Sequence, residues 1–103
     1  MVARYVAHQA ARDFDALVEL FADDAVVVDE GKTWRGKEQI RAWREGVASV
    51  YQYTTELRGV ERGRGGQHVA QIRLEGNFPG GVVDLRYRFT VDGDRIRRLT
   101  IAP

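Results

Sequence analysis

The sequence predicts a single α+β domain, residues 1–103, in which helices come first and a sheet follows. In the first half, apolar residues recur at three- and four-residue spacing, as in Val2, Tyr5 and Val6, which is typical of amphipathic helices. In the second half, apolar and polar residues alternate between glycine-rich turns, which is typical of strands joined by hairpins. Helices followed by a long meander of strands indicate a sheet that is covered by helices on one face.

Three helices are expected in the first half, each with one apolar face. Asp13 is a candidate N-cap of the second helix, and Gly36 would open the third. The expected faces are Val2, Tyr5, Val6 and Ala10 in the first helix, Phe14, Leu17, Val18 and Phe21 in the second, and Ile40, Trp43 and Val47 in the third. Asp23-Asp24 is expected to end the helical pattern before a strand at Ala25–Val28.

The second half is predicted to contain four strands. Turn signals at residues 63–66, 77–81 and 92–93 separate them. The third strand alternates well, with Leu85, Tyr87 and Phe89 on one face. In the fourth strand, the alternation of apolar and polar residues changes face between Ile96 and Leu99, which predicts a β-bulge near Arg97-Arg98. Gly59 and Gly76 lie inside strands and are expected to mark bends.

Composition excludes several classes of function. The chain has no cysteine, so it has neither a disulfide framework nor a thiolate nucleophile. His8 and His68 are far apart in sequence, so no metal site is predicted. Its apolar runs are too short to span a membrane, and its N-terminus does not have the pattern of a signal peptide. With a net charge of +1 and no basic stripe, no nucleic-acid partner is expected. We therefore expect a cytoplasmic protein.

Five stretches of the chain resemble a known superfamily. They are Arg4–Val6, Asp13–Leu17, Leu20–Asp29, Arg35–Arg41 and Tyr87–Ile96. Together they resemble the nuclear transport factor 2-like superfamily, and within it the SnoaL-like polyketide cyclases and ketosteroid isomerases. The resemblance covers nearly the whole chain. It implies a cone-shaped, strongly bent antiparallel sheet, with about three N-terminal helices that close an apolar pocket.

Asp29 is the first candidate for a catalytic residue. It follows Ala25 and Val27 at a period of two, so the three side chains share one face of the strand. The resemblance implies that this face lines the pocket and that Asp29 moves a proton. Apolar surroundings raise the pKa of a carboxyl group, which suits it to general-base catalysis near neutral pH. The alternative is that Asp29 turns outward with Glu30 and Gly31 and is solvated.

The resemblance implies two further catalytic candidates, Tyr5 and His68. Tyr5 matches the tyrosine of ketosteroid isomerases that donates a hydrogen bond to the developing oxyanion, and its alternative role is to fill the core. His68 is a possible acid or base, as in the dehydratase branch, although its place beside a glycine turn also fits a half-solvated rim. The resemblance also aligns Leu85 with the aspartate that ketosteroid isomerases keep protonated and use as the second hydrogen-bond donor to the oxyanion. A leucine side chain cannot donate a hydrogen bond.

The remaining candidates concern the pocket wall and the outer face of the sheet. Expected pocket residues are Trp34, Trp43, Tyr53, Phe78, Leu85, Tyr87 and Phe89, with Phe78 in a loop where it could gate the mouth. The alternative is that most of the aromatic residues simply fill the core, as aromatics at helix and sheet periodicity usually do. Asp84 and Arg86 match two residue types of the epoxide-hydrolase branch, but their parity predicts that they point outward. Arginines and glutamates on that outer face indicate ion pairs or the surface of a homodimer.

Two functions follow from these residues. The first is an enzyme without a cofactor that moves a proton on a small hydrophobic carbonyl compound, as an isomerase, cyclase or dehydratase, using Asp29 and Tyr5. The second is a non-catalytic module that binds a small ligand or dimerises on the same scaffold. The Tyr5–Asp29 pair favours the first, and Leu85 favours the second.

Overall fold

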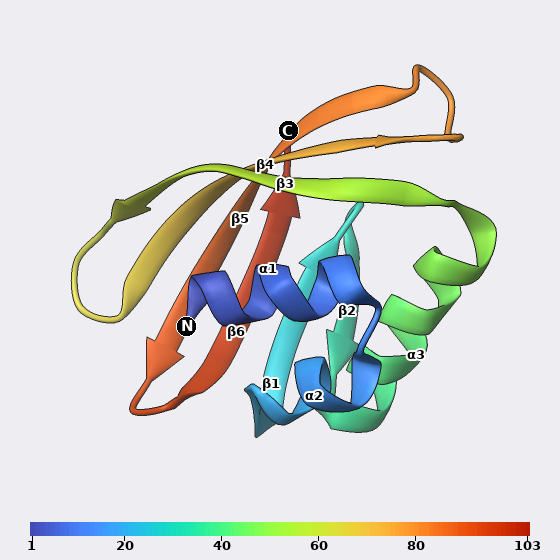
Figure 1. Cartoon of the computed structure of the whole chain (residues 1–103). Coiled ribbons are helices and arrows are strands. Elements are labelled where there is room, and N and C mark those ends of the chain that lie inside the picture. Colours follow the sequence, from blue (N-terminus) through green and yellow to red (C-terminus); the bar gives the residue numbers. More distant parts are fainter.

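The computed structural model describes all residues 1–103 and contains three helices and one six-stranded sheet (Figure 1). The helices are α1 (Val2–Ala11), α2 (Phe14–Glu19) and α3 (Gly36–Val50). The strands are β1 (Phe21–Asp29), β2 (Lys32–Arg35), β3 (Tyr53–Arg62), β4 (Gln67–Gly76), β5 (Val82–Asp92) and β6 (Arg95–Ala102). The predicted α+β class, with helices before the long meander, is confirmed. None of the helices combines the length and the apolar character that crossing a membrane requires.

The sheet is strongly bent but does not close on itself. Its strand order is β2-β1-β6-β5-β4-β3, so β2 and β3 are its two edges. Most neighbours run antiparallel as predicted, but β1 and β6 are parallel. The parallel pair arises because α3 and the whole meander lie between these two strands in the sequence, which supplies the long connection that parallel strands need. Figure 1 shows the sheet curling around α1.

Two β-bulges account for part of the bend. Thr90 pairs with Arg98 and Val91 with Ile96, which leaves Arg97 as an extra residue in β6. The bulge predicted near Arg97-Arg98 is therefore confirmed. On β3, Arg58 is the extra residue next to Gly59, where the sequence predicts a bend. A bulge bends the strand that carries it and increases its twist, so both sites help the sheet to wrap around the helix.

Gly76 marks the second predicted bend. A Cβ atom at this position would overlap the backbone of Gln52 and the side chain of Tyr53. Asn77 reinforces the close approach, because its side chain accepts a 2.9 Å hydrogen bond from the backbone of Gln52. Glycine is therefore required where the end of β4 meets the start of β3.

The core lies between α1 and the concave face of the sheet. Tyr5 is its centre: the ring is fully buried and makes edge-on contacts with Phe21, Tyr87 and Phe89 at centroid distances of 6.1, 6.0 and 5.3 Å. Such edge-to-face pairs add to the stability that burial of the rings provides. Asp13 caps α2 as predicted, accepting a hydrogen bond from the backbone of Ala16.

Three details of the predicted helices are wrong. Gln9, rather than Ala10, completes the buried face of α1, because its amide finds hydrogen-bond partners inside the protein. Phe21 begins β1 instead of extending α2. Asp23 and Asp24 lie within β1 as exposed residues, although the pairing of β1 with β6 is interrupted between Phe21 and Val26.

Candidate functional site

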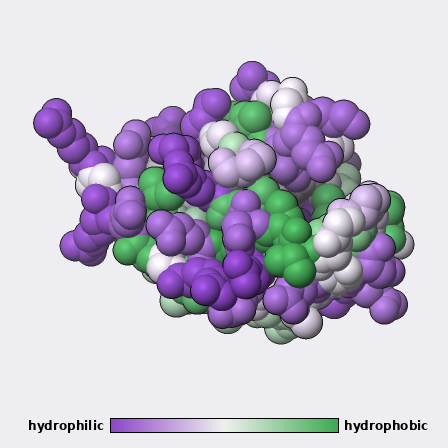
Figure 2. Space-filling model, turned by 90° about the horizontal axis from the view of Figure 1, so that it is seen from above, coloured by the Kyte–Doolittle hydropathy of each residue, from purple (hydrophilic) through white to green (hydrophobic).

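An apolar cavity of about 640 Å³ opens at one end of the curled sheet. Its wall is formed by the ends of β1, β4 and β6, the starts of β3 and β5, the β4–β5 turn and one side of α3. Of its 17 lining residues, 11 are hydrophobic. Figure 2 shows the molecule from above, with an area of hydrophobic surface among hydrophilic side chains. A concave apolar site with a few polar groups is the usual setting for a small-molecule ligand.

Asp29 lies on the wall of this cavity, at the last position of β1. Ala25 and Val27, on the same face of the strand, are fully buried. The carboxylate is half-buried, and its Oδ2 accepts a 3.0 Å hydrogen bond from the indole Nε1 of Trp43. Asp29 therefore lines the cavity with its carboxylate bonded to Trp43, and Glu30 and Gly31, which follow it in the turn, lie on the same wall.

Arg44 is a cavity residue that our sequence reasoning missed. Its side chain leaves α3 toward the core and is 3% exposed. Its Nη1 donates to the hydroxyl of Tyr5 at 3.0 Å and to Oε1 of Gln9 at 2.6 Å, and its Nη2 donates to the hydroxyl of Tyr53 at 3.2 Å. The guanidinium also stacks on the Trp43 ring, at 4.2 Å from the ring centroid.

A signal for Arg44 was present in the sequence. Ile40, Arg44 and Ala48 are spaced four residues apart, which places all three on one face of a helix. Ile40 and Ala48 are both buried in the structure, so Arg44 shares the buried face. Arginine side chains are usually exposed to solvent, so the four-residue spacing of Arg44 from Ile40 and Ala48 does not by itself indicate that Arg44 is buried.

Neutral polar side chains surround the Arg44 guanidinium. Gln9 links the group together, donating from Nε2 to Thr55 Oγ1 and to the Tyr87 hydroxyl, both at 3.2 Å. None of the ion pairs in the protein includes Arg44. The guanidinium is thus held in place by hydrogen bonds, without a carboxylate beside it.

Tyr5 and Tyr87, the two fully buried tyrosines of this cluster, stay protonated at neutral pH. Burial raises the pKa of Tyr5 and of Tyr87, and the Arg44 cation lowers each pKa by less than burial raises it. Burial by itself lowers the pKa of Arg44, but the hydroxyls of Tyr5, Tyr87 and Tyr53 raise it by more, so the net direction is upward. The cluster therefore carries one positive charge and several neutral hydroxyl groups.

The structure brings only some of the predicted site residues together. Those that line the cavity are Asp29, Tyr53, Phe78, Leu85 and Tyr87. Tyr5 does not line it, because its hydroxyl lies in the core against Arg44. Trp43 and Phe89 are core residues, and the half-buried Trp34 packs against the core, so these three do not form the wall as expected.

His68 lies at the other end of β4 from the cavity. It pairs in register with Arg62 and Phe89, whereas Leu74, six residues further along β4, lines the cavity. Six residues of strand span about 20 Å. The half-exposed side chain is beside the Gly65-Gly66 turn, as its alternative reading predicted. The alternation of side chains along the strand predicted that His68 shares the inner face with Ala70 and Ile72. It could not predict at which end of the sheet the cavity opens.

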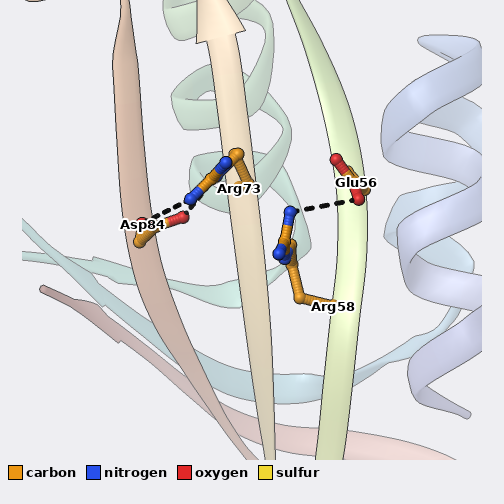
Figure 3. Close-up of polar contacts among 4 residues, drawn as sticks. All are labelled: Glu56, Arg58, Arg73 and Asp84. Carbon is orange, nitrogen blue, oxygen red and sulfur yellow. Dashed lines mark hydrogen bonds and ion pairs between the residues drawn. The ribbon is translucent and has the colours of Figure 1, made fainter.

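Asp84 and Arg86 point away from the cavity, as their parity predicted. Both are exposed on the outer face of the sheet. Arg73 donates two hydrogen bonds to Asp84, at 2.8 and 3.1 Å, and a neighbouring pair joins Arg58 to Glu56 (Figure 3). The hydrogen bonds from Arg73 lower the pKa of Asp84. No cluster of three or more His, Asp or Glu side chains offers a metal site.

Comparison with known proteins identifies the family. The SnoaL-like domain family matches residues 2–99. The chain belongs to the SnoaL-like family. The resemblance inferred from the sequence is therefore confirmed. No curated protein matches the chain at a significant level.

Several solved structures have the same architecture as this chain. A candidate polyketide cyclase of Sinorhizobium meliloti is 36% identical, covers 98% of this chain and 92% of its own, and superposes with a TM-score of 0.93. A protein of Catenulispora acidiphila with a ketosteroid isomerase-like fold, solved in complex with trimethylamine, is 22% identical over 99% of this chain and 83% of its own, with a TM-score of 0.89. A candidate polyketide cyclase of Pseudomonas putida is also 22% identical, over 99% of this chain and 87% of its own, with a TM-score of 0.86. Family and fold are thus shown, whereas an activity has to be argued from the site.

Proposed function

We propose that this SnoaL-like protein binds a small hydrophobic carbonyl compound in its cavity and moves a proton on it, as an isomerase, cyclase or dehydratase. The observation that carries the proposal is the position of Asp29. Its carboxylate lies on the wall of an apolar cavity and is oriented by the hydrogen bond from Trp43. A carboxylate that is held next to a bound carbonyl compound can abstract an α-proton as a general base. Asp29 supplies the base in this scheme, and no cofactor is needed.

Proton abstraction next to a carbonyl group places negative charge on the carbonyl oxygen, so the site needs a donor for it. The sequence pointed to Tyr5 for this role, but Tyr53 and Arg44 are the donors on the cavity wall. The Tyr53 hydroxyl accepts from Arg44, which has no acceptor atoms, so the tyrosine's own proton remains available to a ligand. We assign oxyanion stabilisation to Tyr53 and give Tyr5 the role of holding Arg44 in place.

The relatives support a small-molecule site. Two of the similar structures are candidate polyketide cyclases, and a third holds trimethylamine. Cyclisation of a polyketide chain begins with removal of a proton next to a carbonyl group, which is the chemistry that Asp29 is positioned to perform. His68 has no part in the proposal, since it lies far from the cavity along β4.

Exchange of α-protons tests the proposal without knowledge of the natural substrate. The probe is 2-tetralone, a hydrophobic ketone, in deuterated buffer, with deuterium incorporation followed by NMR. The wild type should accelerate the exchange, and Asp29→Asn should slow it by about 10²-fold or more, the usual contribution of a general base. Glu30→Gln is the matched control, because it removes the exposed carboxylate next in sequence on the same wall. Equal rates for wild type and Asp29→Asn would exclude Asp29 as the base.

A non-catalytic binding module is the second candidate function. It is favoured by Leu85, which lines the cavity and which the sequence resemblance aligns with the second acid of ketosteroid isomerases. It is also favoured by the burial of the Tyr5 hydroxyl away from the cavity. Binding of 2-tetralone without any acceleration of proton exchange would support this function instead of the enzyme.

We also propose that the protein forms a homodimer through the outer face of the sheet. The support is the exposed surface of β3, β4 and β5, on which arginines alternate with acidic side chains, as in the Arg73–Asp84 and Arg58–Glu56 pairs (Figure 3). A surface with both signs of charge can complement itself in a symmetric pair.

A further inference from the structure

The cavity wall carries a buried positive charge that the protein does not neutralise. Arg44 remains protonated at all accessible pH values, and its side chain is almost completely buried. The partners of its nitrogens are the hydroxyls of Tyr5 and Tyr53 and the amide oxygen of Gln9, all of them neutral. Asp29 and Glu30 also line the cavity, but neither pairs with Arg44.

Such a charge is unfavourable unless something offsets it. Removing an ion from water costs several kcal/mol in a real protein, as an order of magnitude, and buried charges are usually paired for this reason. Hydrogen bonds to hydroxyl and amide groups recover part of that cost. The remainder would be recovered by an anion in the cavity, where little water competes with the pair.

The guanidinium also has hydrogen-bonding capacity to spare. Of the five N–H donors that an arginine carries, those of Nη1 go to Tyr5 and Gln9, and one of Nη2 goes to Tyr53. The second N–H of Nη2 has no partner among the hydrogen bonds of Arg44, and the buried Nε–H has none at all. The spare N–H of Nη2 can donate to a ligand carboxylate together with the hydroxyl proton of Tyr53, and such a charge-assisted bond is stronger than one between neutral groups.

We infer, resting on the proposed function for the location of the site, that the natural ligand is a hydrophobic carboxylic acid whose carboxylate pairs with Arg44. Tyr53 completes the anion site through its hydroxyl proton. The apolar wall, including Leu85 and Phe78, holds the hydrocarbon part of the ligand. With the proton-moving role of Asp29, the substrate class becomes keto acids, anchored at Arg44 and reacting near Asp29.

Three probes of similar shape and different charge test this inference. They are naphthalene-2-acetate, its neutral amide, and the cationic 2-(2-naphthyl)ethylamine. Isothermal titration calorimetry at pH 7 should show the acetate binding at least about tenfold more tightly than the amide, with the amine weakest, because a charge-assisted bond to Arg44 adds to the same apolar contact. Equal affinities for acetate and amide, or failure of the acetate to bind, would overturn the inference.

Two variants of Arg44 test whether this residue causes the preference for the acetate over the amide. Arg44→Met keeps the length of the side chain and removes its charge, so it should bind acetate and amide equally well. Arg44→Met removes a buried charge but leaves the amide oxygen of Gln9 and the hydroxyls of Tyr5 and Tyr53 without their donor, so we expect its thermal midpoint to fall below that of the wild type. Circular dichroism should confirm that the variant is folded before its affinities are compared. Arg44→Lys keeps the charge without the planar fork and should retain part of the preference. A preference that survives unchanged in both variants would place the anion elsewhere.

The results separate this inference from the proposed function. If naphthalene-2-acetate binds through Arg44 but 2-tetralone shows no accelerated proton exchange, the anion site stands and the enzymatic function fails. If 2-tetralone exchanges its protons through Asp29 while the acetate shows no preference over the amide, the function stands and the anion site fails.

Discussion

The indole Nε1 of Trp43 donates a 3.0 Å hydrogen bond to Oδ2 of Asp29 and thereby ties α3 to the end of β1. Arg44, the next residue on α3, lies on the wall of the same cavity. One turn of helix thus positions both the carboxylate and the guanidinium of the site. Because α3 also packs its Ile40 side chain into the core, the placement of both charged groups depends on the packing of this helix.

Trp43→Phe should weaken the positioning of Asp29. The substitution keeps an aromatic ring in the core but removes the donor Nε1–H together with part of the ring volume on which Arg44 stacks. The loss of ring volume is shared by the control variant described below, whereas the loss of the hydrogen bond to Asp29 is not. We expect the exchange of 2-tetralone α-protons to slow by about tenfold, which corresponds to ~1.4 kcal/mol of activation free energy. The free energy of unfolding should fall by about 1 kcal/mol through the lost hydrogen bond.

Trp34→Phe is the matched control for this change. The Nε1 of Trp34 is buried and has no hydrogen-bond partner, so its removal costs no hydrogen bond. The exchange rate should stay at the wild-type level. If both tryptophan variants slow the exchange to the same extent, the Trp43–Asp29 bond does not orient the base.

The buried tyrosines predict a loss of stability at alkaline pH. Burial raises the pKa of Tyr5 and Tyr87 in the folded state, whereas in the unfolded chain a tyrosine titrates at about 10. A raised folded pKa gives a contribution to stability that is fully present below pH 10 and is lost as pH rises above it. Each of the two tyrosines should lower the free energy of unfolding by up to about 1.4 kcal/mol per pH unit above that point.

Tyr5→Phe should remove one tyrosine's share of this slope. Urea unfolding between pH 8 and pH 11 measures it, with Tyr51→Phe as control because Tyr51 is an exposed tyrosine on the cavity rim. A slope unchanged in Tyr5→Phe would mean that the hydroxyl of Tyr5 reaches water in the native state.

Leu85→Asp should introduce the acid that ketosteroid isomerases have and this protein lacks. The wild type should turn over a β,γ-unsaturated ketosteroid poorly, and the variant should recover part of the roughly 10²–10³-fold that one oxyanion donor contributes. Stability should fall by about 1–3 kcal/mol, because a polar group replaces a leucine on an apolar wall. Val83→Asp, two residues earlier on the same wall, should lose stability without gaining activity. Robust turnover by the wild type would show that Leu85 does not occupy the acid's position.

Sedimentation should detect a homodimer at about tens of micromolar protein, the range expected of a weak pair. Arg86→Glu on the outer face of β5 should shift the protein to monomer, since it reverses a charge on the proposed interface. Arg4→Glu makes the same change on the exposed side of α1 and should leave the dimer intact. A wild type that sediments as a monomer would contradict the proposed dimer.

Local rules were enough to predict most elements of this fold. The period of two placed Asp29 on the face of Ala25 and Val27, and a phase shift located the bulge at Arg97. The capping of α2 by Asp13 followed in the same way. These features depend on residues close together in the chain, so their physical causes can be read from a short window of sequence.

The sequence by itself therefore determined the family, the order of most of the elements and most of the apolar side chains that face inward. Only the tertiary structure decided that β1 lies parallel to β6, that the cavity opens near Leu74 rather than His68, and that Arg44 is buried. The site of Arg44 is built by Tyr5, Gln9 and Tyr53, which come from α1 and β3. A buried charge is tolerable only where such distant groups converge on it, and that convergence exists only after the sheet has curled around α1.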